Sequence, residues 1–170
     1  MNTQGRIMLS PVIAVVGLCL VAAATGKSRR FEPSKTENGD KGIVKSCGGQ
    51  KFYAWFSPSK VRDGDNVTFH MTITPDVGIS AGHYSLDVYI PPMEYPQITY
   101  EDNFTCKTLG PFLAKFCPLQ AGKTYDETAW AIANLASYGV SPGDYFVRAR
   151  LWDEKGQLFI CGEANVSVIP

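Results

Sequence analysis

Apolar and polar residues alternate with a period of two along most of the chain beyond Ile43. The clearest example runs from Asn66 to Thr74, where the apolar members are Val67, Phe69, Met71 and Ile73. Successive side chains of a β-strand point to opposite faces of its sheet. The pattern therefore predicts a strand with one apolar face turned toward a core.

Three later segments repeat this alternation, with the apolar residues Tyr84, Leu86, Val88 and Ile90; Tyr145, Val147, Ala149 and Leu151; and Ile160, Ala164, Val166 and Val168. We expect the apolar sets to point inward and their neighbours Thr72, Asp87, Arg148 and Ser167 to point outward. Clusters of Gly, Pro and Asp separate the segments. About seven short antiparallel strands spaced in this way predict an all-β sandwich.

Two segments do not show a clean alternation. The segment from Pro91 to Lys115 is predicted to be irregular, and it carries the large residues Tyr95, Tyr100, Phe104, Phe112 and Leu113. An irregular segment of this length usually has a function, often as the rim of a binding site. The Ala-rich segment from Thr128 to Ala136 fits both a helical and a strand period.

The first 26 residues are predicted to be a cleaved secretory signal peptide. Arg6 precedes an apolar stretch of 13 residues, Val12 to Ala24, and small residues follow at the end of the segment. A membrane-spanning helix needs about 20 apolar residues, so this stretch is too short to be an anchor. Residues 27–42 are polar and aperiodic and are expected to form a mobile tail, which leaves residues 43–170 as one domain.

The charges of the chain argue against a nucleic-acid partner. Sixteen Lys and Arg balance sixteen Asp and Glu, and removal of the signal peptide takes away Arg6 alone. The mature chain then has a net charge of −1 and no basic stripe that could hold phosphates.

The cysteines of the mature chain predict two disulfides and no metal site. Cys47, Cys106, Cys117 and Cys161 are even in number, as expected in an oxidising compartment. A zinc site needs close Cys pairs, whereas here the closest pair is 11 residues apart and the chain has only two His.

A possible nucleophile motif, G-x-S-x-G, occurs at Gly78 to Gly82 with Ser80 at its centre. A serine hydrolase requires a helix after the motif and a distant His, but here a strand follows, and the later His, His83, is three residues from Ser80. We interpret the motif as a turn and expect no enzyme activity and no cofactor. His70 and His83 are expected to face each other on the solvent side of a hairpin.

Three N-glycosylation sequons begin at Asn66, Asn103 and Asn165. Asn66 and Asn165 have outward parity and Asn103 lies in the segment predicted to be irregular, so glycans would not disturb the core.

Several motifs together resemble the ML (lipid-recognition) domain family from Cys47 to the C-terminus. They are Cys47-Gly48-Gly49, Asp65 to Phe69, Cys117-Pro118 to Tyr125, Pro142 to Tyr145, Leu151-Trp152-Asp153 and Leu158 to Cys161. The family includes the lysosomal cholesterol carrier of Niemann-Pick type C disease and related lipid-transfer proteins. One departure is the absence of Cys between Ser57 and Arg62, where the cholesterol carrier has an extra disulfide.

The resemblance implies an immunoglobulin-like β-sandwich with a lipid cavity between its sheets, and pairing of Cys47 with Cys161 and of Cys106 with Cys117. It implies a secreted or endolysosomal monomer that binds a sterol, a fatty acid or phospholipid chains and docks on a membrane or a receptor. The residues expected to contact the lipid are Phe69, Met71, Leu86, Val88, Ile90, Trp130, Ile132, Tyr145, Val147, Leu151, Ile160 and Val166.

The inward positions suggest an uncharged cavity whose mouth lies between Pro91 and Phe116. Ala149, Gly162 and Ala164 are small, which leaves room for a ligand or lets large neighbours pack closely. The sequence leaves two other functions open: a recognition sandwich that binds a protein through an exposed apolar patch, and an esterase at Ser80.

Overall fold

The computed structural model describes residues 40–108 and 117–170. These residues form nine strands and one short 3-10 helix: β1 (Gly42–Gly49), β2 (Phe52–Ser57), β3 (Lys60–Val61), β4 (Asn66–Ile73), β5 (Ala81–Tyr89), β6 (Ile98–Thr105), β7 (Tyr125–Ile132), η3 (Ala136–Tyr138), β8 (Gly143–Asp153) and β9 (Leu158–Val168). Within this part of the chain, no helix has the length and apolar character needed to cross a bilayer. The signal peptide and most of the expected N-terminal tail lie outside the described residues.

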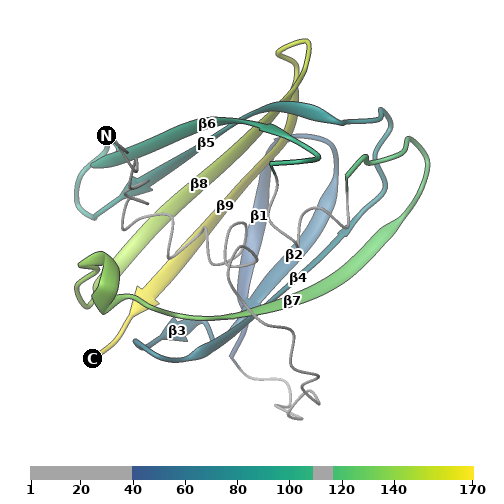
Figure 1. The fold of residues 1–170 in the computed structure, drawn as a ribbon. Coiled ribbons are helices and arrows are strands. Elements are labelled where there is room, and N and C mark those ends of the chain that lie inside the picture. The colour runs from purple at the N-terminus through teal and green to yellow at the C-terminus, as the bar shows by residue number, and fades with distance from the viewer. Residues whose placement is uncertain (1–39, 109–116) are drawn as a thin grey trace, which may run out of the picture.

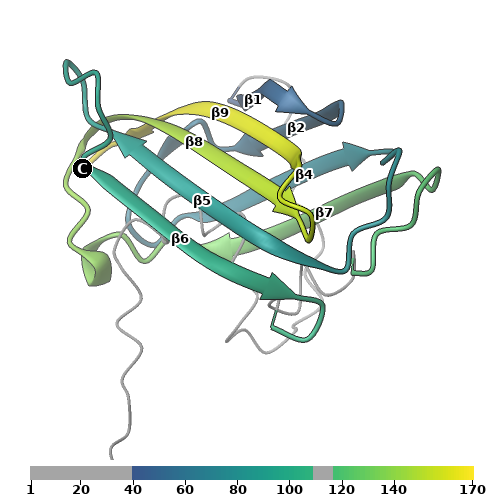
Figure 2. The same ribbon diagram turned by 90° about the horizontal axis from the view of Figure 1, so that it is seen from above.

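The strands form two layers, which confirms the predicted β-sandwich (Figures 1 and 2). The β8 layer contains the neighbouring strands β6, β5, β8 and β9, with β3 parallel to β9. The β4 layer contains β2, β4 and β7. Among residues 40–108 and 117–170, strands β6 and β7 each pair on one side only, and we call them the free edges of the two layers.

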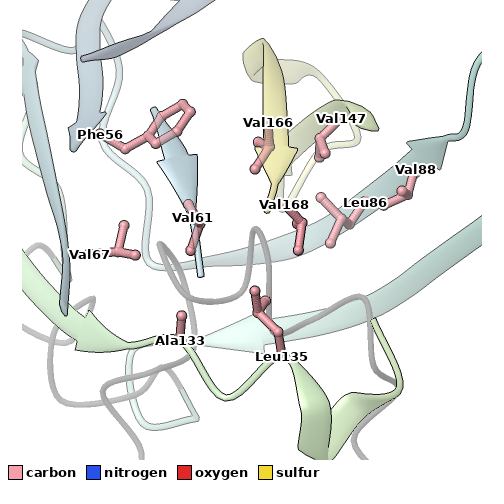
Figure 3. Packing of buried hydrophobic residues seen from close by; sticks show 10 residues of the cluster. All are labelled: Phe56, Val61, Val67, Leu86, Val88, Ala133, Leu135, Val147, Val166 and Val168. Carbon is pink, nitrogen blue, oxygen red and sulfur yellow. The ribbon is translucent and has the colours of Figure 1, made fainter. Parts of the chain in front are cut away.

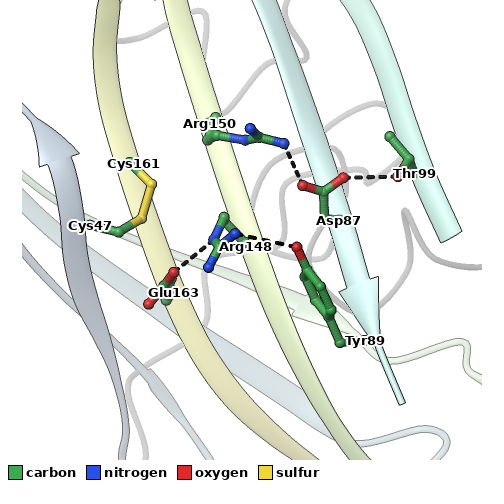
Figure 4. A network of polar contacts seen from close by, with 8 residues as sticks. All are labelled: Cys47, Asp87, Tyr89, Thr99, Arg148, Arg150, Cys161 and Glu163. Atoms are coloured by element: carbon green, nitrogen blue, oxygen red, sulfur yellow. Dashed lines mark hydrogen bonds and ion pairs between the residues drawn. A yellow bond between two sulfur atoms is a disulfide. The ribbon is translucent and has the colours of Figure 1, made fainter. Parts of the chain in front are cut away.

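Strand β1 belongs to both layers. Its first residues pair with β2, as in Gly42 opposite Phe56, and its last residues pair with β9, as in Lys45 opposite Glu163. The register shifts between Ser46 and Gly48, as expected of a β-bulge, which bends a strand. The Cys47–Cys161 disulfide joins β1 to β9 at this bend (Figure 4).

The predicted parity of the core strands agrees with the observed packing. Buried residues from both layers meet in one cluster, which Figure 3 shows: Phe56, Val61, Val67, Leu86, Val88, Ala133, Leu135, Val147, Val166 and Val168. A smaller cluster contains Ile73, Ile79, Phe104, Tyr125 and Phe159. Each cluster is the apolar side of strands whose other side is polar.

The segment from Pro91 to Lys115, predicted to be irregular, contains strand β6. Its alternation is hard to see because Asp102 has the inward parity shared by Ile98, Tyr100 and Phe104. A free edge strand tolerates such a charge because one side of it is open to water. Phe112 and Leu113 lie outside the described residues.

The two histidines do not face each other, contrary to the prediction. Strands β4 and β5 belong to different layers, so His70 and His83 lie on opposite sides of the sandwich. The His70 ring stacks on Trp55 with 5.2 Å between ring centroids, and the His83 ring stacks on Trp152 at 4.4 Å.

Both disulfides that the family resemblance implies are present, Cys47–Cys161 and Cys106–Cys117. They close loops with sequence separations of 114 and 11 residues. The loop-entropy model gives a stabilisation of about 5 kcal/mol for the long loop and about 3 kcal/mol for the short one. We predict that replacing both Cys47 and Cys161 with Ser lowers the free energy of unfolding more than replacing both Cys106 and Cys117. Urea unfolding of the two double variants measures this difference, and equal losses would contradict the argument from loop length.

Candidate functional site

The inner surfaces of the two layers form the candidate site. In the β8 layer, cross-strand pairs such as Leu86 with Ala149 and Val88 with Val147 build continuous apolar rows. In the β4 layer, Phe69 and Met71 lie on the same face as buried Val67 and Ile73. Nine of the residues predicted to contact a lipid lie on these surfaces: Phe69, Met71, Leu86, Val88, Tyr145, Val147, Leu151, Ile160 and Val166.

Many apolar side chains on these inner surfaces are only partly buried. This set contains Phe69, Met71, Tyr84, Ile98, Tyr100, Tyr145, Ala149, Leu151, Ile160 and Ala164. A close-packed protein interior leaves few voids, so inward-pointing apolar residues in a filled core would be fully buried. Their residual exposure indicates apolar surface between the layers that the described residues do not cover.

Two residues predicted to face the ligand, Trp130 and Ile132, instead point outward, and a third, Ile90, lies exposed just beyond the end of β5. Trp130 is 46% exposed, Ile132 45% and Ile90 41%, and the inward positions of β7 are held by Ala129 and Ala131. The segment from Thr128 to Ala136 fits both a helical and a strand period, so the sequence alone did not determine which of its residues face inward. In β7 the small side chains face inward instead, which leaves more room between the layers.

At Gly162 the small residue lets large neighbours pack closely and does not leave room for a ligand. A Cβ atom at Gly162 would lie 3.0 Å from Val44 Cγ1 and 3.2 Å from Phe52 Cζ, so large neighbours already pack against this position. Gly162 therefore allows close packing near the bend in β1. Ala149 and Ala164 remain partly buried on the inner surface.

Glu127 is a charged residue on the inner surface that the sequence analysis missed. It lies opposite Met71 and is partly buried, and it alternates with outward-facing Asp126 and Thr128. No hydrogen bond or ion pair joins its carboxylate to the described residues. The expectation of an uncharged inner surface is therefore wrong at the β7 edge, and correct strand parity for the segment from Thr128 to Ala136 would have revealed it.

The opposite free edge, β6, also carries polar groups on its inner face. The Tyr100 hydroxyl donates a hydrogen bond to Asp102 Oδ2 at 3.2 Å, and the Tyr84 and Tyr100 rings are 5.8 Å apart. Burial, the hydrogen bond to Tyr100 and the nearby Asp102 charge raise the pKa of the Tyr84 phenol well above its usual range. Tyr84 is therefore a neutral hydroxyl that can donate or accept a hydrogen bond.

The outer face of the β8 layer is polar and internally paired (Figure 4). Asp87, only 3% exposed, accepts hydrogen bonds from Thr99 Oγ1 at 2.9 Å and Arg150 Nη2 at 2.5 Å. Arg148 Nε donates to Glu163 Oε1 at 2.7 Å, and this bond raises the pKa of the Arg148 guanidinium. The predicted outward parity of Asp87 and Arg148 is correct. On this face Asp87 pairs with Arg150, and Arg148 pairs with Glu163.

The surroundings of Ser80 differ from those of a hydrolase nucleophile. The Ser80 hydroxyl donates to Glu154 Oε1, while His83 stacks on Trp152. Strand β5 begins at Ala81, immediately after Ser80, where a nucleophile elbow would begin a helix. At Gly82 a Cβ atom would lie 2.0 Å from the Trp152 carbonyl oxygen, so close strand packing requires this glycine.

A groove of about 680 Å³ lies beside the turn between β1 and β2. Its lining includes Gln50, Lys51, Thr74 and Asp76, and the Gln50 side-chain oxygen accepts a hydrogen bond from the Asp76 backbone N–H. Phe52, Tyr53 and Ile73 also line the groove, so its lining is mixed, and an apolar ligand there would contact Lys51 and Asp76 as well as apolar groups.

Comparisons with known proteins agree with this geometry. Residues 45–168 match the family model described as ML domain. A Niemann-Pick type C2 protein from the Japanese carpenter ant superposes with a TM-score of 0.55 at 15% identity, covering 75% of this chain and 99% of that one. Chicken MD-1 complexed with lipid IVa has a TM-score of 0.49 at 14% identity, covering 75% and 96%. The search of curated proteins gave no match.

The opposite placement of Leu86 and Ile132 predicts opposite responses to a new charge. Leu86 is 4% exposed on the inner surface, so Leu86→Glu places a carboxylate without a partner among apolar groups. We expect it to lower the free energy of unfolding by several kcal/mol. Ile132→Glu makes the same kind of change at an outward, 45% exposed position, and in protein from which N-glycans have been removed we expect a change within about 0.5 kcal/mol. Urea unfolding of the two variants tests the assignment, and comparable losses would contradict it.

Proposed function

This chain belongs to the ML domain family, and from that premise we propose that it is a secreted lipid carrier that holds an apolar ligand between its two layers. It acts as a monomer and delivers the ligand by docking on a membrane or a receptor. Its two disulfides fit an extracellular or endolysosomal compartment.

The main support for a lipid between the layers is the partly buried apolar inner surface. Both layers contribute to it, for example through Phe69 and Met71 from β4 and Ala149 and Leu151 from β8. Contact between this apolar surface and water is unfavourable, so burying the surface against a hydrocarbon ligand stabilises the complex.

The affinity that such a surface provides is sufficient for a carrier. A 16-carbon acyl chain gains about 12 kcal/mol on leaving water at about 0.8 kcal/mol per CH₂. Immobilisation of the chain offsets several kcal/mol of that gain. Micromolar to nanomolar binding then requires no charged clamp.

The free edges supply the polar groups that meet a lipid head group. Glu127 on β7 and Asp102 on β6 both have inward parity at the open side of the sandwich, and Tyr84 and Tyr100 add hydroxyls beside Asp102. Carboxylates repel an anionic head group, whereas hydroxyls and carboxylates hydrogen-bond to a neutral alcohol. Neutral, hydroxyl-bearing lipids such as sterols are thus the preferred class over fatty-acid anions.

Extraction of the protein with organic solvent, followed by mass spectrometry, tests the function. A carrier purified from secreting cells is expected to yield a lipid in a stoichiometric amount. A protein-recognition sandwich would yield none, and an esterase would hydrolyse an activated ester in a manner lost in Ser80→Ala. Either of those outcomes would replace the carrier proposal.

The preference for neutral lipids depends on Glu127. We predict that Glu127→Gln tightens binding of a fatty-acid anion about fivefold, which corresponds to the removal of about 1 kcal/mol of repulsion. Binding of a neutral fluorescent sterol should be unchanged. The matched control is Glu101→Gln on the outer face of β6, for which neither ligand should respond. Displacement titrations measure both affinities, and an equal effect of the two variants would refute the head-group assignment.

A further inference from the structure

The outer face of β7 exposes two large apolar side chains. Trp130 and Ile132 are two residues apart on the same face of the strand, and they are 46% and 45% exposed. Their outward neighbours Thr128 and Asp126 are polar, as expected of the solvent side of an antiparallel sheet. Two such side chains in one place indicate a surface that something covers.

A glycosylation sequon lies in register with this pair. Asn66 is directly opposite Ile132 and Thr68 is directly opposite Trp130, so the two ends of the sequon Asn66-Val67-Thr68 border the two apolar side chains. Val67 is 6% exposed and points inward, which places Asn66 and Thr68 on the outer face. Directly opposite residues have Cβ atoms about 5 Å apart, within reach of a sugar attached to Asn66.

We propose that Asn66 carries an N-linked glycan whose first sugar packs on Trp130 and Ile132. The donor is an oligosaccharide joined to a lipid through a diphosphate. The Asn66 amide nitrogen forms a bond to the anomeric carbon of the first sugar, the bond from that carbon to the diphosphate breaks, the lipid diphosphate leaves and one amide proton is released. The inference needs the secretory route of the proposed function but not lipid binding, so the two can fail separately.

The surroundings of the three sequons favour a glycan on Asn66 as the group that covers Trp130 and Ile132. Asn103 lies opposite His83, and Asn165 lies opposite Phe146. Neither His83 nor Phe146 is an exposed large apolar residue. Asn66 alone among the three sequons has such residues in register, and the apolar face of a sugar ring is complementary to an indole ring.

A thermodynamic cycle tests the packing of the glycan. The protein is expressed in a secreting eukaryotic cell line as the wild type, Asn66→Gln, Trp130→Thr and the double variant. Peptide mass spectrometry is expected to find Asn66 occupied. Asn66→Gln should lower the melting temperature by about 3 °C in the wild-type background and by less than about 1 °C in the Trp130→Thr background.

Asn165→Gln is the matched control, and its effect on the melting temperature should be the same with and without Trp130. If Trp130→Thr is not secreted, a nuclear Overhauser effect between the N-acetyl methyl group of the first sugar and the Trp130 indole replaces the cycle. An unmodified Asn66, an equal effect of Asn66→Gln in both backgrounds, or no such Overhauser effect would overturn the proposal. An unmodified protein that binds phosphatidylcholine vesicles through Trp130 would identify the patch as a membrane surface instead.

Discussion

The structure depends on a single strand that pairs with both layers. Strand β1 hydrogen-bonds to β2 before its bend and to β9 after it, and the Cys47–Cys161 disulfide fastens the bend. Backbone pairing through β1 therefore holds the layers together at one side, and at the other side β6 and β7 are the outermost strands of the described part of the chain. The Cys106–Cys117 disulfide links the segment after β6 to the segment before β7, so the layers are also connected at that side although strands β6 and β7 do not pair with each other.

The two faces of the β8 layer differ in chemistry, since the outer face is polar and the inner face is apolar. On the outer face, Asp87 and Arg150 form one ion pair and Arg148 and Glu163 form another, so these charges neutralise one another. The inner face of the same strands can then be apolar at nearly every position, as in Leu86, Val88 and Val147. This separation explains how the layer stays intact although its inner face is not fully covered.

The sequence predicted the strands whose alternation is strong, including β4, β5, β8 and β9, because burial on one face imposes a period of two. It failed at the two free edges. In β7, Trp130 and Ile132 were expected to contact the ligand, but the period of this segment was ambiguous, and Ala129 and Ala131 face inward instead. In β6, Asp102 interrupts the apolar pattern because one side of an edge strand meets water. The polar inner residues Glu127 and Asp102 were missed for the same reasons.

Photolabelling tests the central claim, that a lipid lies between the layers, most directly. The purified protein is loaded with a sterol or an acyl chain that carries a diazirine, irradiated, and digested for peptide mass spectrometry. The account predicts labels on inner residues of both layers, such as Phe69 and Met71 on β4 and Ala149 and Leu151 on β8. Labels confined to outward residues such as Trp130 and Ile132 would contradict it.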